Sequence, residues 1–155
     1  DEGSYTRYDF KTADKLLAVM GSLMANYRGD LNLLHERSRD SHDLEGRLKT
    51  LGKGVGDVTV GIFLRELRGV WAKADPRPTP LVILAARNLG IIESKDPAEA
   101  LEGLKAFWGE SGVPGKAFVD FETALLRVGK DLCRRVRCGQ CPLRPGCPAA
   151  TSSSA

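Results

Sequence analysis

Residues 133–147 read CRRVRCGQCPLRPGC and contain all four cysteines of this 155-residue chain. The gaps between Cys133, Cys138, Cys141 and Cys147 are four, two and five residues. Four thiolates spaced in this way can surround one metal centre, and such a set is the usual ligand set of an iron-sulfur cluster. Structural zinc usually takes two closely spaced cysteine pairs, whereas only Cys138 and Cys141 form such a pair here. The stretch therefore predicts a metal site, with an iron-sulfur cluster favoured over zinc and over two disulfides.

The composition of the chain limits the classes of protein to which it can belong. With 42% hydrophobic residues, the chain can bury the core of one domain or of two small lobes. A net charge of +3 does not by itself predict a nucleic-acid partner. The charge is concentrated, however, because six basic residues crowd the cysteine region: Arg127, Lys130, Arg134, Arg135, Arg137 and Arg144. Clustered cysteines in a chain otherwise free of them predict a reducing compartment.

The longest apolar run, residues 81–86, is too short to cross a bilayer, and no signal-peptide pattern is visible. We therefore expect a cytoplasmic protein without a membrane partner. The chain begins without an initiator methionine, so we expect it to be a piece of a longer protein.

Apolar side chains recur every three to four residues along most of the chain, which predicts an all-α fold of about seven helices. The first helix is expected from Thr12, with a core face made of Ala13, Leu16, Leu17, Met20, Met24 and Tyr27. Predicted helix starts are Asp30, Ser41, Thr79 followed by Pro80, and Asp96. The last long helix delivers Cys133 to its site. Residues 1–10 and 151–155 are expected to be poorly ordered.

Residues 51–59 read LGKGVGDVT and lie between two predicted helices. The glycines allow a sharp bend and leave bare amide groups at the start of the second helix. Bare amides at a helix N-terminus bind phosphate. An ordinary tight turn between two core helices is the alternative, because short glycine patterns recur by chance.

Asp75 lies in the loop formed by residues 72–80, in which three prolines exclude regular structure. A carboxylate held on such a loop can stabilise a developing positive charge. The alternative is that Asp75 only begins a proline-rich turn. Among other residues, His35 and His42 are expected to be solvated, and Trp71 and Trp108 to be core or interface residues.

The hairpin, the aspartate and the four-cysteine loop, in this order, resemble the endonuclease III family of helix-hairpin-helix DNA glycosylases with an iron-sulfur cluster. The likeness runs from about Thr12 to Cys147. It implies two helical lobes, with residues 11–93 carrying the hairpin and residues 94–150 carrying the cluster loop. It also implies a monomeric base-excision repair enzyme, which removes a damaged or mismatched base from duplex DNA in the nucleoid of a prokaryotic cytoplasm.

The resemblance assigns roles to residues one by one. Lys53, Gly54, Val55 and Gly56 match the hairpin that grips a DNA phosphate. Asp75 matches the catalytic aspartate. Cys133, Cys138, Cys141 and Cys147 match the ligands of a [4Fe-4S] cluster, and Arg134, Arg135 and Arg137 would lie against the DNA backbone.

The chain departs from the family pattern in three places. Family members that also cut the strand have a lysine where this chain has Val58, and an aliphatic side chain cannot form an imine. We therefore expect a monofunctional glycosylase without AP-lyase activity, for which Lys53 is only a weak substitute nucleophile. The first cysteine gap is four residues rather than the family's usual six. The family's first helices are also missing, which predicts an N-terminally truncated member.

Two other functions remain open at the level of the sequence. The hairpin and the cysteine loop could serve a DNA-binding or damage-sensing module without catalysis. A small ferredoxin-like electron carrier is the third reading, although such a carrier needs neither a phosphate-binding hairpin nor an arginine-rich cysteine loop.

Overall fold

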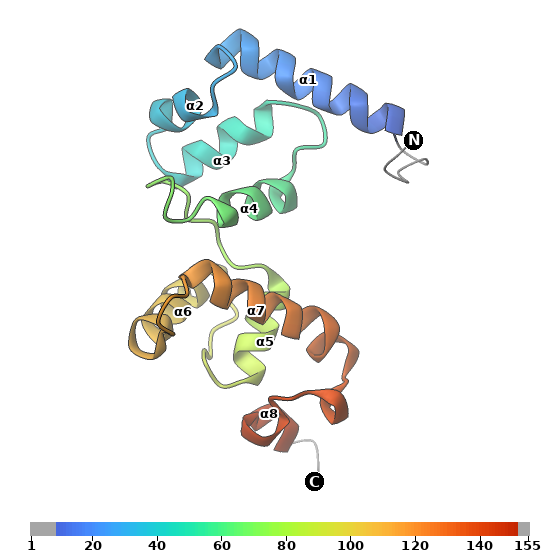
Figure 1. Ribbon diagram of the computed structural model, residues 1–155, viewed down its shortest axis with the longest axis vertical. Coiled ribbons are helices and arrows are strands. Elements are labelled where there is room, and N and C mark those ends of the chain that lie inside the picture. The colour runs from blue at the N-terminus through green and yellow to red at the C-terminus, as the bar shows by residue number, and fades with distance from the viewer. Residues whose placement is uncertain (1–8, 152–155) are drawn as a thin grey trace. The chain divides into compact units, whose positions relative to one another are not determined.

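The computed structural model describes residues 9–151, and within this range it contains helices and turns but no strand (Figure 1). This confirms the predicted all-α class. The helices are α1 (Asp9–Tyr27), α2 (Leu31–Arg37), α3 (Ser41–Thr50), α4 (Asp57–Glu66), α5 (Pro80–Asn88), α6 (Pro97–Ser111), α7 (Phe118–Asp131) and α8 (Pro148–Thr151). Three 3-10 turns, η1 (Cys133–Arg135), η2 (Cys138–Gln140) and η3 (Arg144–Gly146), separate α7 from α8.

Most of the two tails expected to be poorly ordered, residues 1–8 and 152–155, lies outside the described residues. Of the remaining residues, Asp9 and Phe10 belong to α1 and Thr151 is the last residue of α8. None of the helices in the described part is long and apolar enough to cross a membrane.

The chain divides into two compact units, Asp1–Pro76 and Arg77–Ala155, which we call unit 1 and unit 2. The sequence placed this division after residue 93. The difference concerns α5, which packs against α7 in unit 2. Its buried residues Val82, Ile83, Ala85 and Ala86 form the centre of the unit 2 core.

In unit 1, helices α1 to α4 surround a core that also takes in the loop after α4. Its buried residues are Leu23, Tyr27, Leu34, Leu44, Leu48, Leu51, Val60, Leu64, Trp71 and Ala74. Helix α1 approaches the α3–α4 turn so closely that a Cβ atom on Gly52 would lie 2.6 Å from Cγ2 of Val19. Glycine at this position lets α1 lie directly on the turn.

The predicted core face of α1 was wrong for five residues. Ala13, Leu16, Leu17, Met20 and Met24 are exposed, whereas Leu23 and Tyr27 are buried and Val19 is partly buried against the core. Apolar residues occupy more than one face of this helix, so their spacing does not determine which face is buried. Contact with the α3–α4 turn selects the face of Val19, Leu23 and Tyr27.

The helix starts follow the local sequence closely. The side chain of Asp96 accepts hydrogen bonds from the amides of Ala98 (2.8 Å) and Glu99 (3.0 Å) at the start of α6. Thr79 and Asp30 cap α5 and α2, as predicted. The cap of α3 is Asp40 and not Ser41, because the Asp40 side chain accepts the hydrogen bond from the Asp43 amide.

Gly129 of α7 marks the closest approach of two helices in unit 2. A Cβ atom at this position would lie 2.1 Å from the backbone oxygen of Leu81 in α5, and a backbone atom cannot move aside as a flexible side chain can. We expect Gly129→Ala to lower the free energy of unfolding by about 2–3 kcal/mol, the usual cost of overpacking. Urea denaturation measures this change.

Gly109 provides the matched control, because a Cβ atom there meets nothing within 4 Å and the residue lies inside α6. Gly109→Ala should leave the free energy of unfolding unchanged or raise it by up to about 1 kcal/mol. Equal effects of the two substitutions would show that α5 and α7 are not in close contact in solution.

Candidate functional site

All four cysteines line one cavity of about 240 Å³ in unit 2. The chain curls around this cavity in three short turns: Cys133 begins η1, Cys138 begins η2, and Cys147 directly follows η3. Hydrogen bonds close the turns, from the amide of Cys141 to the oxygen of Cys138 and from the amide of Cys147 to the oxygen of Arg144, both 3.2 Å. The remaining wall consists of Asn88, Leu89, Val128, Leu132, Val136, Arg144, Ala149 and Ala150.

The cysteine loop lacks a hydrophobic core of its own, because none of residues 133–147 is fully buried. The four cysteines are free thiols and do not form disulfides. Backbone turns, the packing of Cys133 against the unit 2 core and a thiol hydrogen bond from Cys147 hold this segment. A group bound by the four sulfurs would add cross-links between its turns.

Within the described residues, no three His, Cys, Asp or Glu side chains lie close enough together to hold a single metal ion. The cavity that the cysteines line has a volume of about 240 Å³. A water molecule in the liquid occupies only about 30 Å³, so the cavity has much more room than a single metal ion needs.

Asn88, at the end of α5, contacts two of the cysteines. The thiol of Cys147 donates a hydrogen bond to the backbone oxygen of Asn88 at 3.2 Å. Burial raises the pKa of the Cys133 thiol, a hydrogen bond with the Asn88 side chain lowers it, and the other three cysteines raise it further. Since metal ligation requires thiolates, a positively charged metal centre would have to offset the cost of ionising Cys133 in this partly buried position.

The predicted glycine hairpin is present in unit 1 as the turn between α3 and α4. Gly54 has a φ of +94°, a conformation that favours glycine, and Gly56 is the N-cap of α4. No side chain caps α4, so the amides of its first turn remain available to a ligand. Lys53, Gly54 and Gly56 are exposed, and Val55 is half-buried.

Two lysines that the sequence analysis missed lie at this hairpin. Lys15 of α1 is close enough that a Cβ atom on Gly54 would be 3.3 Å from its Nζ atom. Lys49 pairs with Asp57, the first residue of α4, and this pairing lowers the pKa of Asp57 and raises that of Lys49. The acid at the helix start is thus neutralised, and Lys15 and Lys53 leave the turn with a positive charge.

Asp75 is held by Arg68, another residue that the sequence analysis missed. Nη1 of Arg68 donates a hydrogen bond to Oδ1 of Asp75, and Nη2 donates one to the backbone oxygen of Pro76, both at 2.5 Å. The Arg68 side chain is only 9% exposed, whereas that of Asp75 is 36% exposed. The carboxylate is therefore fixed in direction and still accessible from solvent.

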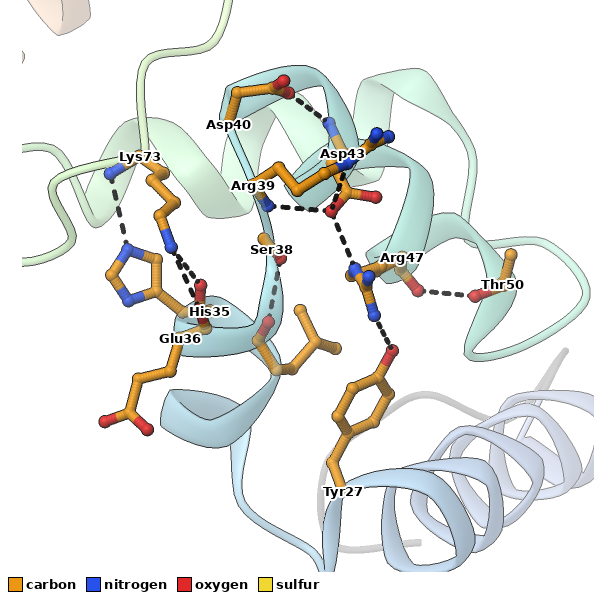
Figure 2. A network of polar contacts seen from close by, with 11 residues as sticks. Tyr27, His35, Glu36, Ser38, Arg39, Asp40, Asp43, Arg47, Thr50 and Lys73 are labelled. Atoms are coloured by element: carbon orange, nitrogen blue, oxygen red, sulfur yellow. Dashed lines mark hydrogen bonds and ion pairs between the residues drawn. The ribbon is translucent and has the colours of Figure 1, made fainter.

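The loop that leads to Asp75 is fastened to α2. The backbone amide of Lys73 donates a hydrogen bond to Nε2 of His35 (3.4 Å), and its Nζ donates to the backbone oxygens of His35 (2.9 Å) and Glu36 (3.2 Å), as Figure 2 shows.

Trp71 stacks on His35 with ring centres 4.9 Å apart, and its Nε1 donates to Oδ1 of Asn32 (3.1 Å). The prediction that His35 is solvated was wrong, because Trp71 covers it; Trp71 itself is buried, as predicted.

The structure distributes the candidate residues over both units. The hairpin and Asp75 belong to unit 1, whereas the cysteines and the exposed Arg134, Arg135 and Arg137 belong to unit 2. Val58, which the resemblance matches to a lysine of the endonuclease III family, is 74% exposed on the first turn of α4. Comparisons with protein-family models, with curated proteins and with solved structures found no match for this chain.

Proposed function

We propose that this chain is a DNA N-glycosylase of the helix-hairpin-helix type, which hydrolyses the bond between a damaged or mismatched base and its sugar in duplex DNA. One observation carries the proposal: an uncapped glycine hairpin and a rigidly held, solvent-accessible carboxylate occur together in unit 1. The hairpin can bind a phosphate, and the carboxylate can act on a sugar.

In this proposal the amides at the start of α4 bind a backbone phosphate, and the charge of Lys15 and Lys53 strengthens that contact. The target nucleotide is turned out of the helix, since the bond to be cut is not reachable inside the base stack. As the glycosidic bond breaks, positive charge develops on the sugar. The Asp75 carboxylate stabilises this charge and orients the attacking water, while Arg68 keeps the carboxylate in one orientation.

The first turn of α4 presents Val58 where a strand-cutting enzyme of the family has its lysine. Because valine cannot form an imine with the sugar, the product is an abasic site in an uncut strand.

We further propose that the four cysteines hold a [4Fe-4S] cluster. The support is a set of four free thiols around one cavity, which is larger than a zinc ion requires and is lined in part by apolar side chains. When bound, the cluster supplies four iron-sulfur bonds that hold the loop in shape. Glycosidic hydrolysis needs no electrons, so the role of the cluster is structural, and Arg134, Arg135 and Arg137 on the loop it shapes contact the DNA backbone.

The test uses the full chain, purified without oxygen, and a panel of duplexes that each carry one lesion or mismatch. We expect excision in at least one duplex, detected as a strand break only after alkali treatment. Strand breaks without alkali would overturn the assignment as a monofunctional enzyme. Failure to excise any base in a broad panel would overturn the assignment as an enzyme.

A non-catalytic damage-binding module is the second candidate, and one observation favours it. Arg68 pairs with Asp75, and a paired carboxylate stabilises a developing positive charge less than an unpaired one does. Under this alternative, the chain binds the same duplexes and leaves their bases in place.

The arginine loop predicts how DNA binding depends on salt. If Arg134, Arg135 and Arg137 each contact a phosphate, replacing all three with glutamine should lower the slope of log Kd against log salt concentration by about 3. Binding should weaken equally for intact and damaged duplexes, because phosphate contacts carry no sequence information. Fluorescence anisotropy at several salt concentrations measures this.

Two exposed lysines of unit 2, Lys95 and Lys116, provide the control for a simple loss of charge. Replacing both with glutamine should change the slope by less than one. A triple arginine variant with the slope of the wild type would show that the loop does not contact DNA.

A further inference from the structure

Val136 adopts a backbone conformation that is unusual for its residue type. Its φ of +51° and ψ of +38° lie in the left-handed region, which a β-branched side chain rarely occupies. Among residues 9–151, Arg28 is the other non-glycine residue with a positive φ. The amide of Val136 donates a hydrogen bond to the oxygen of Cys133 (3.1 Å), and the amide of Arg137 donates one to the oxygen of Leu132 (3.0 Å).

The end of α5 contains the same pair of hydrogen bonds with glycine in the left-handed position. The amide of Gly90 donates to the oxygen of Arg87 (3.0 Å), that of Ile91 donates to the oxygen of Ala86 (2.9 Å), and the φ of Gly90 is +71°. This is the usual way in which a helix ends. One chain therefore builds the same turn twice, and only the copy between Cys133 and Cys138 contains a strained side chain.

The side chain of Val136 lies at the mouth of the cysteine cavity. It is 80% exposed to solvent and yet forms part of the cavity wall. The wall beside it includes the apolar residues Leu132 and Val128, and the exposed cation Arg144 also borders the cavity. Valine in this place extends the apolar wall toward solvent, which glycine would not do.

We propose that Val136 covers the cysteine-bound cluster and limits the access of water and small solutes to it. This inference rests on the proposed cofactor and not on glycosylase activity. Between Cys133 and Cys138 the chain turns at residue 136 in the left-handed conformation, in which glycine would be unstrained. Valine in its place carries backbone strain but sets two methyl groups at the edge of the cavity, where they reduce the access of solvent to a bound cluster.

Two substitutions distinguish the effect of backbone strain at residue 136 from the effect of its side chain as a cover. Val136→Ala keeps a Cβ atom, and with it most of the strain, but removes both methyl groups. Val136→Gly removes the cover and the strain together. Each protein is loaded with iron and sulfide, and EDTA is added under nitrogen. The loss of iron is followed by the visible absorbance and by the iron content per chain, and the melting temperature is measured on the loaded chains without EDTA.

We expect both variants to lose iron several-fold faster than the wild type. The melting temperature of the loaded chain should rise by about 2–5 °C in Val136→Gly and should not rise in Val136→Ala. A merely structural role would make iron retention and stability change in the same direction, whereas the proposal predicts opposite directions in Val136→Gly. Val136→Ile, which keeps the cover, should retain iron as the wild type does. Val113→Ala, at an exposed valine of unit 2 that does not line the cavity, should also have no effect.

Equal rates of iron loss in all these proteins, in a wild type that does hold iron and sulfide, would overturn this inference alone. A wild type that binds neither iron nor sulfide would overturn the cofactor assignment and this inference with it. If both variants lose iron faster than the wild type and the chain excises no base, the result supports the role of Val136 as a cover. It then contradicts only the proposed glycosylase activity.

Discussion

Asp75→Asn should lower the single-turnover rate of base excision by about 10³-fold, which is the size of effect expected when a group that stabilises transition-state charge is neutralised. Asparagine has nearly the shape of aspartate, and its side-chain oxygen can still accept the hydrogen bond that Nη1 of Arg68 donates. The change therefore removes the charge and leaves the buried Arg68 with a partner. Duplex binding, measured by anisotropy on the same lesion, should stay within about twofold of the wild type, because the phosphate contacts are made elsewhere.

Asp14→Asn provides the matched control, since Asp14 is an exposed carboxylate of α1 in the same unit. It removes the same charge and should leave the excision rate unchanged. If Asp75→Asn still excised the base at the rate of the wild type, Asp75 would not be the catalytic group. If the wild type bound damaged duplexes without excising a base, and Asp75→Asn did not change this binding, the chain would be a damage-binding module and not an enzyme.

Cys138→Ser should abolish cluster assembly and, with it, the shape of the cysteine loop. Residues 133–147 have no fully buried side chain, so the cluster would provide most of the energy that orders them. We expect iron and sulfide to be absent from the purified variant, the thermal transition of unit 2 to broaden, and DNA affinity at low salt to fall by at least about tenfold as the contacts of Arg134, Arg135 and Arg137 are lost. Iron, sulfide and zinc analyses of the wild type, together with anisotropy, measure these effects.

Gly139→Ala, between Cys138 and Cys141, is the control, because a Cβ atom there meets nothing within 4 Å. It should keep both iron and DNA affinity. If the wild type contained zinc in a stoichiometric amount and no sulfide, the four cysteines would hold zinc and not an iron-sulfur cluster. A Cys138→Ser protein without iron that bound DNA normally would show that the cluster does not shape the DNA-binding loop.

Features that depend on neighbouring residues were predictable. The caps at Asp30, Thr79 and Asp96 each satisfy amides within four residues of themselves, so short sequence patterns identify them. Even there the prediction failed by one position at Asp40, because adjacent Asp and Ser are both good caps and only the hydrogen bond to Asp43 distinguishes them.

Features that depend on distant contacts were not predictable. The buried face of α1 is chosen by the approach of Val19 to Gly52, and the same approach brings Lys15 to Gly54. The pairing of Arg68 with Asp75 depends on how the loop after α4 folds back, and that loop is fastened by Trp71 and Lys73 to α2, more than thirty residues away. Spacing along the chain contains no signal for such contacts.

The sequence by itself determined the all-α class, the glycine turn between two helices and the set of candidate metal ligands, because periodicity, backbone freedom and thiol chemistry belong to individual residues and their near neighbours. Only the tertiary structure decided that the four cysteines line one cavity, that α5 belongs to unit 2, that Arg68 orients Asp75 and that Val136 stands strained at the cavity mouth. These arrangements result from packing between segments distant in the chain, where the burial of apolar surface and close backbone approach select one arrangement among many that the same local patterns allow.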